Sequence, residues 1–98
     1  MTINQRTEQD KLYFAPVGRL DTMTAWEFEK TLTDSLENIN ELVLDLTDLI
    51  YVSSAGLRAI LKAHKIMSRR GGMKVIGVGE MVSEIFEVTG FADMLTIE

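Results

Sequence analysis

The sequence predicts an α/β fold with a mixed, mainly parallel β-sheet of four to five strands and three to four helices. Short apolar runs of strand length alternate along the chain with longer segments whose apolar residues recur every three or four positions. Strands that alternate with helices need crossover connections, which join parallel strands. The length of 98 residues fits one domain, spanning residues 1–98.

Two strands are expected at the start of the chain. Residues 2–8 alternate loosely and predict an edge strand, and residues 9–10 predict a turn. Residues 12–17 are apolar at both odd and even positions, a pattern typical of a strand covered on both faces. Pro16 within this run favours an edge position or an irregular strand end, because proline cannot donate a ladder hydrogen bond.

The first helix is predicted at residues 22–38, where apolar residues follow helical spacing. Asp21 and Thr22 are both candidate N-caps, and Thr24 opens an S/T-x-x-E capping box. Trp26 lies off the apolar stripe of this helix. We interpret it as a residue at the rim of the core in preference to a partner contact.

The same periodicities predict the remaining elements. Further strands are expected at residues 42–46, 74–78 and 95–97. Further helices are expected at residues 54–69 and 81–89, and a loop at residues 47–53.

Several kinds of active site lack their residues in this sequence. The chain has no cysteine, which excludes thiolate nucleophiles and thiolate metal sites. His64 is the one histidine and falls inside a predicted helix, without the spacing of a zinc site. Asp45 and Asp48 alone would suit Mg²⁺, but a solvated or capping role is favoured. The sequence therefore predicts no enzyme, no catalytic residue, no metal and no cofactor.

Charge and hydropathy restrict the partners. The net charge of −5 and the scattered Lys and Arg residues argue against direct nucleic-acid binding. Arg69 and Arg70 are interpreted as offsetting the negative end of a helix. No apolar stretch approaches the roughly 20 residues that span a bilayer. With no visible secretory signal, these features predict a cytoplasmic protein.

The most informative stretch joins a predicted strand to a predicted helix at residues 49–58. Ser53 and Ser54 are both good N-caps, and the small Ala55 and Gly56 leave the first turn open to another molecule. The free N–H groups and the helix dipole favour an anion there, so a phosphorylated hydroxyl is the alternative to a simple cap. The residues by themselves favour the cap.

The stretch from Asp45 to Leu57 resembles the signature of the STAS domain, the fold of bacterial anti-sigma factor antagonists. That family shows an apolar strand, a short loop and then Asp-Ser-Ser/Thr-Gly-Leu at the start of a helix. Gly18-Arg19-Leu20-Asp21 is similar to the family's Gly-x-Leu-Asp before its first helix. The resemblance covers nearly the whole chain.

The resemblance implies a switch between protein partners. It implies that a kinase-like anti-sigma factor, a serine kinase, binds this protein and phosphorylates Ser54, and that a phosphatase resets the system. Ser53 replaces the family's aspartate and Ala55 its second Ser/Thr. The protein is expected to be a monomer or a weak homodimer. The expected partner-binding residues are Asp21, Tyr51, Val52, Ser53, Ser54, Ala55, Gly56, Leu57 and Arg58.

Two other functions are compatible with the sequence. Some STAS proteins resemble accessory subunits of lipid or anion transport complexes, and this chain would suit a soluble accessory of that kind. A small-ligand-binding module or weak nucleotidase would use the helix N-terminus as its anion site. The latter ranks last, because no base or metal cluster accompanies that site.

Overall fold

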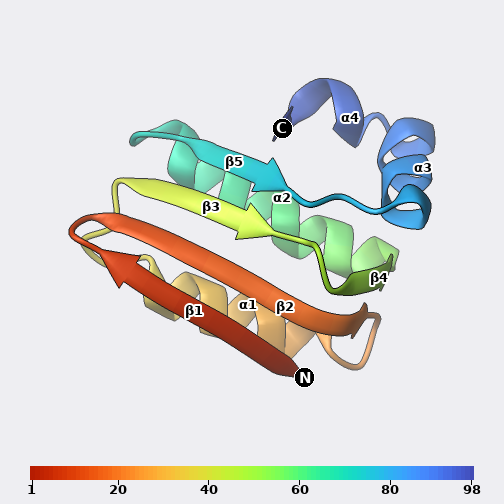
Figure 1. Ribbon diagram of the computed structural model, residues 1–98, viewed down its shortest axis with the longest axis horizontal. Helices are drawn as coiled ribbons and strands as arrows, with labels where there is room; N and C mark the ends of the chain where they lie inside the picture. The colour runs from red at the N-terminus through yellow and green to blue at the C-terminus, as the bar shows by residue number, and fades with distance from the viewer.

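Six strands and four helices form in the computed structural model, which describes residues 1–98 (Figure 1). The strands are β1 (Thr2–Glu8), β2 (Lys11–Leu20), β3 (Glu41–Asp45), β4 (Leu49–Val52), β5 (Met73–Ile76) and β6 (Thr96–Ile97). The helices are α1 (Ala25–Ser35), α2 (Ser54–Ser68), α3 (Glu80–Thr89) and α4 (Phe91–Met94).

The strands make one mixed sheet in the order β1-β2-β3-β5-β6, and β4 pairs with β2 beyond the end of β3. Only the β1–β2 pair is antiparallel, so the predicted mainly parallel α/β fold is confirmed. The sheet gains a sixth strand because β4 forms where a loop was expected. Leu49 and Val52 at its two ends are buried, which ties this short segment to the sheet.

β2 is the longest strand and lies inside the sheet, so the edge position suggested by Pro16 is wrong. Residues 11–14 of β2 pair with β3 and residues 18–20 pair with β4. Pro16 falls between these two ladders, where a missing N–H costs no bond on that side. Only one face of β2 is fully buried, through Leu12, Phe14 and Pro16, whereas the alternate residues are half-buried. The expectation of cover on both faces is therefore also wrong.

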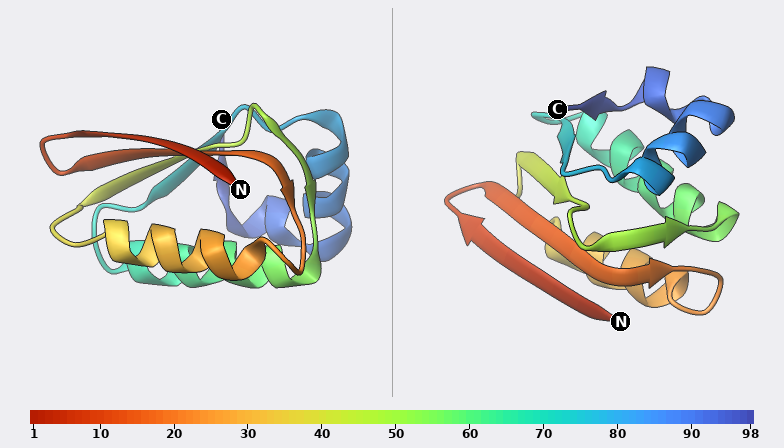
Figure 2. Two further views of the ribbon diagram at one scale, coloured as in Figure 1. Left: turned by 90° about the horizontal axis from the view of Figure 1, so that it is seen from below. Right: turned by 45° about the vertical axis from the view of Figure 1, so that its right-hand side comes forward.

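Helices α1 and α2 lie side by side under one face of the sheet, as Figure 2 (left) shows. Their apolar faces and the buried face of β2 form the core, in which Phe14 and Phe28 meet edge to face with ring centroids 5.7 Å apart. α3 packs beside β4, and α4 joins α3 to the last strand. The core thus continues to the end of the sheet at which β4 meets α2.

α1 is shorter than predicted at both ends, and the predicted capping box does not form. The Asp21 carboxylate accepts the backbone N–H of Thr24 at 3.0 Å, which holds residues 22–24 in a turn before the helix. Glu27, the expected partner in the capping box, instead pairs with the amino terminus of the chain. At the other end, Asn38 has φ 64°, which is incompatible with a continuing helix.

Gly56 brings the first turn of α2 into direct contact with the end of β2. A Cβ atom at this position would lie 2.7 Å from Leu20 Cγ and 3.1 Å from Leu20 O. Leu20 is fully buried, so it has little room to move aside. A side chain at position 56 would therefore push α2 away from the sheet.

We predict that Gly56→Ala lowers the free energy of unfolding by about 1–3 kcal/mol, because the added methyl group overpacks this contact. Urea denaturation monitored by circular dichroism measures the change. Gly79→Ala is the matched control, since no atom lies within 4 Å of a Cβ there. It should cost less than about 1 kcal/mol, the difference between glycine and alanine at the N-cap of α3. Equal losses in the two variants would contradict the close-contact explanation.

Candidate functional site

Ser53 is the N-cap of α2. Its backbone is extended, with φ −86° and ψ 174°, and its Oγ accepts the backbone N–H of Gly56 at 3.2 Å. Its own N–H donates to Leu20 O at 2.7 Å, which joins the cap to the end of β2. The capping role that the sequence left open between two serines therefore belongs to Ser53.

Ser54 is the first residue of α2 and is exposed. Its hydroxyl makes no hydrogen bond within the chain, because Ser53 already serves the first turn. The backbone N–H groups of that turn and the positive end of the helix dipole surround it. Ser54 thus presents a free hydroxyl at a place that favours an anion.

The other residues predicted to bind a partner divide by their burial. The side chains of Val52 and Leu57 lie in the core, and Gly56 is buried against β2. Arg58 is exposed, while Tyr51 and Ala55 are partly exposed. The segment therefore has a buried half that fixes its position and an exposed half that other molecules can reach.

Asp21 and Tyr51 lie at the same end of the sheet as Ser54. Leu20 pairs with Val52 across the β2–β4 ladder, which places Asp21 beside the start of α2 as expected. The Arg19 guanidinium lies over the Tyr51 ring, 4.4 Å from its centroid. These contacts hold the ends of β2 and β4 in place beneath the site.

The pKa of Asp21 is lowered from its ordinary value. The main cause is the backbone N–H of Thr24, which donates a hydrogen bond to the carboxylate. The Thr24 hydroxyl, the Met23 N–H and the positive charge of Arg19 lower the pKa further, whereas burial raises it. Asp21 therefore carries its negative charge in neutral solution and stabilises the turn that leads into α1.

Three exposed apolar side chains at the site were not predicted to bind a partner. Met23 is 87% exposed, Trp26 70% and Ile50 58%. Trp26 lines a groove of about 300 Å³ between the N-terminal ends of α1 and α2, together with Ala55 and Arg58. Its position off the apolar stripe was the one sequence signal of this exposure. Exposed aromatic side chains beside a groove are typical of protein-binding surfaces.

The two aspartates considered for Mg²⁺ have other surroundings. The Asp45 carboxylate accepts the Thr47 hydroxyl at 2.6 Å and the Thr47 N–H at 3.0 Å, so it caps a turn as favoured from the sequence. The backbone carbonyl of Asp48 accepts the Gly18 N–H at 2.9 Å. No group of three or more His, Asp or Glu side chains is arranged to hold a metal ion. A membrane-spanning segment is not found among the helices, which lack the necessary combination of length and hydropathy.

Removing the hydroxyl of Ser53 should affect stability more than removing that of Ser54. We predict that Ser53→Ala lowers the free energy of unfolding by about 1 kcal/mol, because it removes the cap of α2. Ser54→Ala is the matched control and should change the free energy of unfolding by less than about 0.5 kcal/mol, since its hydroxyl is exposed and unbonded. Urea titrations of both variants test this. A larger loss for Ser54→Ala would mean that the cap has been assigned to the wrong serine.

Comparisons with known proteins identify relatives of this chain. The family model described as "STAS domain" matches residues 2–98. An anti-sigma-B factor antagonist of Staphylococcus aureus (strain COL) is 29% identical over 101 residues, which cover 99% of this chain and 94% of that protein.

Solved structures of low sequence identity share the fold. A crystal structure of an anti-sigma factor antagonist from Mycobacterium paratuberculosis has a TM-score of 0.88 at 18% identity, covering 98% of this chain and 83% of that one. The Bacillus cell fate determinant SpoIIAA in its phosphorylated form has a TM-score of 0.75 at 10% identity, covering 99% and 91%. Since the family model spans nearly the whole chain, this protein belongs to the STAS domain family.

Proposed function

We propose that this protein is an anti-sigma factor antagonist, a non-enzymatic regulator that binds a kinase-like anti-sigma factor and is released when Ser54 is phosphorylated. The observation that carries the proposal is the free, exposed hydroxyl of Ser54 at the first position of α2, beside a serine that already caps the helix. The relative from Staphylococcus aureus bears the name of such an antagonist. SpoIIAA, which shares the fold, was solved in a phosphorylated form.

The fold should tolerate the phosphate. A phosphoserine adds about −1.5 to −2 charges and three acceptor oxygens, and at position 54 these would face the free N–H groups of the first turn of α2. That turn contains no acidic residue, since Ser53 stands where the family has an aspartate. The phosphate therefore meets no neighbouring carboxylate within the turn.

The partner should not tolerate the phosphate. In the unmodified complex the small residues around Ser54 allow close approach, so Ser54 becomes buried in the interface. Burying an unpaired charge against a protein surface costs several kcal/mol. A loss of about 3 kcal/mol weakens binding by more than a hundredfold. Phosphorylation thereby frees the anti-sigma factor to return to its sigma factor, and a phosphatase restores the antagonist.

In this proposal the exposed Trp26 and Met23 supply apolar contact area, with Trp26 lining a groove beside Ala55, while Asp21 and Tyr51 form further parts of the surface. Val52, Gly56 and Leu57 act from the core by holding the segment in place. The protein works in the cytoplasm as a monomer or a weak homodimer in this proposal.

The first prediction for this function concerns Ser54. Incubation with a kinase-like anti-sigma factor and ATP should add one phosphate to Ser54, detected by intact-mass spectrometry and peptide mapping. Ser54→Ala should bind the anti-sigma factor at least as tightly as the unmodified protein. Ser54→Asp should bind about a hundredfold more weakly, because it introduces a charge into the interface.

Two outcomes would contradict this proposal. Equal binding of Ser54→Ala and Ser54→Asp would remove the phosphorylation switch. Absence of any phosphate, together with ATP-independent binding to a transport ATPase, would instead support an accessory subunit of a lipid or anion transport complex.

The second prediction concerns Trp26. Trp26→Ala should weaken binding to the anti-sigma factor by about tenfold or more, since exposed tryptophans beside grooves often dominate the binding energy. The stability of the free protein should change little, because the side chain is 70% exposed. Isothermal titration calorimetry measures the binding. Val88→Ala on α3, where the side chain is 84% exposed, is the matched control and should bind normally. Unchanged affinity of Trp26→Ala would place the interface elsewhere.

A further inference from the structure

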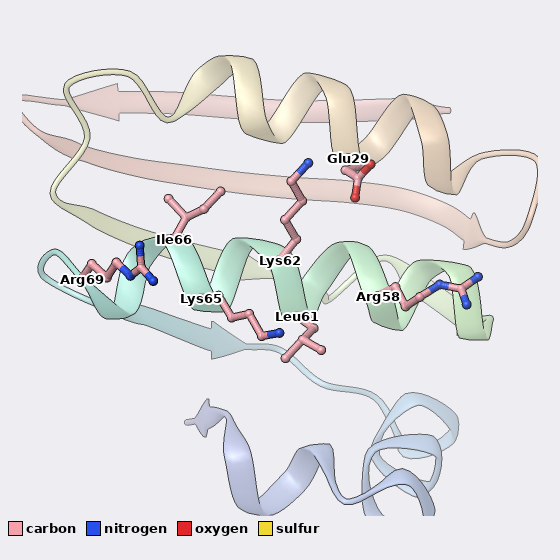
Figure 3. A pocket seen from close by; sticks show the side chains of 7 residues that line it. All are labelled: Glu29, Arg58, Leu61, Lys62, Lys65, Ile66 and Arg69. Carbon is pink, nitrogen blue, oxygen red and sulfur yellow. The ribbon is translucent and has the colours of Figure 1, made fainter.

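Four basic side chains follow one another along the exposed face of α2 and its C-cap. These residues, which we call the basic row, are Arg58, Lys62, Lys65 and Arg69. They line a groove of about 450 Å³ together with Leu61, Ile66 and Glu29 of α1 (Figure 3). Their spacing of four, three and four residues keeps them on one side of the helix.

Little within the chain explains the basic row: Glu29 of α1 is the one acidic side chain that lines its groove, and no ion pair joins it to the row. Of the ten Lys and Arg residues, the other six all have a partner within the chain. Four of these form ion pairs with carboxylates, namely Arg6, Lys11, Lys30 and Lys74. Arg19 lies over the ring of Tyr51, and Arg70 donates to the carbonyls of Leu36 and Ile39 at the end of α1. The members of the basic row make no ion pair, although the chain has 15 acidic residues.

Helix stability does not explain the basic row either. Lys65 and Arg69 near the C-terminal end complement the helix dipole, but Arg58 and Lys62 are too far from that end to benefit. Like charges four residues apart repel each other, and α2 contains no acidic residue to offset this. Arg58 and Lys62 therefore gain nothing from the helix dipole and lie next to other basic side chains, which points to a role outside the chain.

We propose that the basic row binds an acidic surface of the protein partner. This inference rests on the proposed function. It states that the part of the anti-sigma factor that contacts α2 is acidic. The row extends about 16 Å along the helix, and the side chains of Leu61 and Ile66 supply apolar contacts in the same groove. Such a narrow row with apolar neighbours suits an acidic, amphipathic protein segment lying beside α2.

Overall charge favours a protein over a nucleic acid or an anionic membrane as the occupant. The net charge of −5 repels an extended polyanion at long range. A protein can present its acidic residues over the row alone and avoid the acidic remainder of this chain. The basic row thus favours a partner whose acidic patch is small enough to cover the row alone.

The basic row also connects to the switch. Ser54 lies one helical turn before Arg58 on the same exposed side of α2. A phosphate there adds about −1.5 to −2 charges, which offsets part of the row and repels an acidic partner. Phosphorylation then weakens binding through charge along the whole contact as well as through burial at Ser54.

The test reverses the charge of the two central residues of the basic row, Lys62 and Lys65, and leaves Ser54 unchanged. The variant Lys62→Glu/Lys65→Glu and the control Lys30→Glu/Lys74→Glu change the net charge equally, and all four side chains are exposed. Thermal unfolding checks that both variants fold. Calorimetry measures binding to the anti-sigma factor at low and high salt. The row variant should bind about tenfold more weakly or worse, and its affinity should depend less on the salt concentration than that of the unmodified protein. The control should bind within about twofold of the unmodified protein.

The outcomes separate the two proposals. If the row variant binds as well as the control while Ser54→Asp does not bind, the acidic-surface assignment is wrong and the proposed function stands. If the unmodified protein binds no anti-sigma factor, the proposed function fails and a second probe decides on the row. That probe is a synthetic helical peptide with glutamates at i, i+4, i+7 and i+11, titrated into the ¹⁵N-labelled protein. Shifts confined to α2 support an acidic protein segment; no shifts, or binding only to phosphatidylglycerol vesicles or duplex DNA, would overturn it.

Discussion

The contact between the first turn of α2 and the end of β2 is the constraint on which the rest of the site depends. Gly56 lets the two backbones approach, and the Ser53 N–H closes the contact by donating to Leu20 O at 2.7 Å. Ser53 is thereby committed to the cap, with its side chain turned back onto the helix. Ser54 follows as the first helical residue and has to face outward.

The same contact places the exposed features of the site around Ser54. β4 pairs with the end of β2 directly before the chain enters α2, and the β2–β4 ladder sets the position of Asp21 and Tyr51. α1 lies beside α2, which brings Trp26 to the groove between them. A small backbone contact therefore organises groups that come from four separate elements.

Much of the fold and part of the site were predictable from the sequence, for physical reasons that also explain the failures. Periodic burial is a local pattern, so it located both long helices and the buried strand β3. β4 was missed because its pairing partner is distant in the chain and its four residues show no clear alternation. Pro16 led to the wrong prediction of an edge strand. A proline is tolerated inside the sheet here because it falls between the β2–β3 and β2–β4 ladders, a gap that only the folded sheet creates. The motif located the two serines, but both have the chemistry of a cap, and only the backbone geometry separates them. Helical periodicity placed Trp26 off the apolar stripe of α1, but the groove that Trp26 lines exists only once α1 and α2 pack together, which no local pattern encodes.

The division of labour between adjacent serines has an evolutionary consequence. Under the proposed switch, selection for folding acts on position 53, where the hydroxyl caps the helix, whereas selection for signalling acts on position 54. Under the same proposal, a lineage without the kinase could change the residue at position 54 and still inherit an intact domain. The switch and the scaffold can in this way be gained, lost or retuned independently, although the residues responsible are neighbours in the chain.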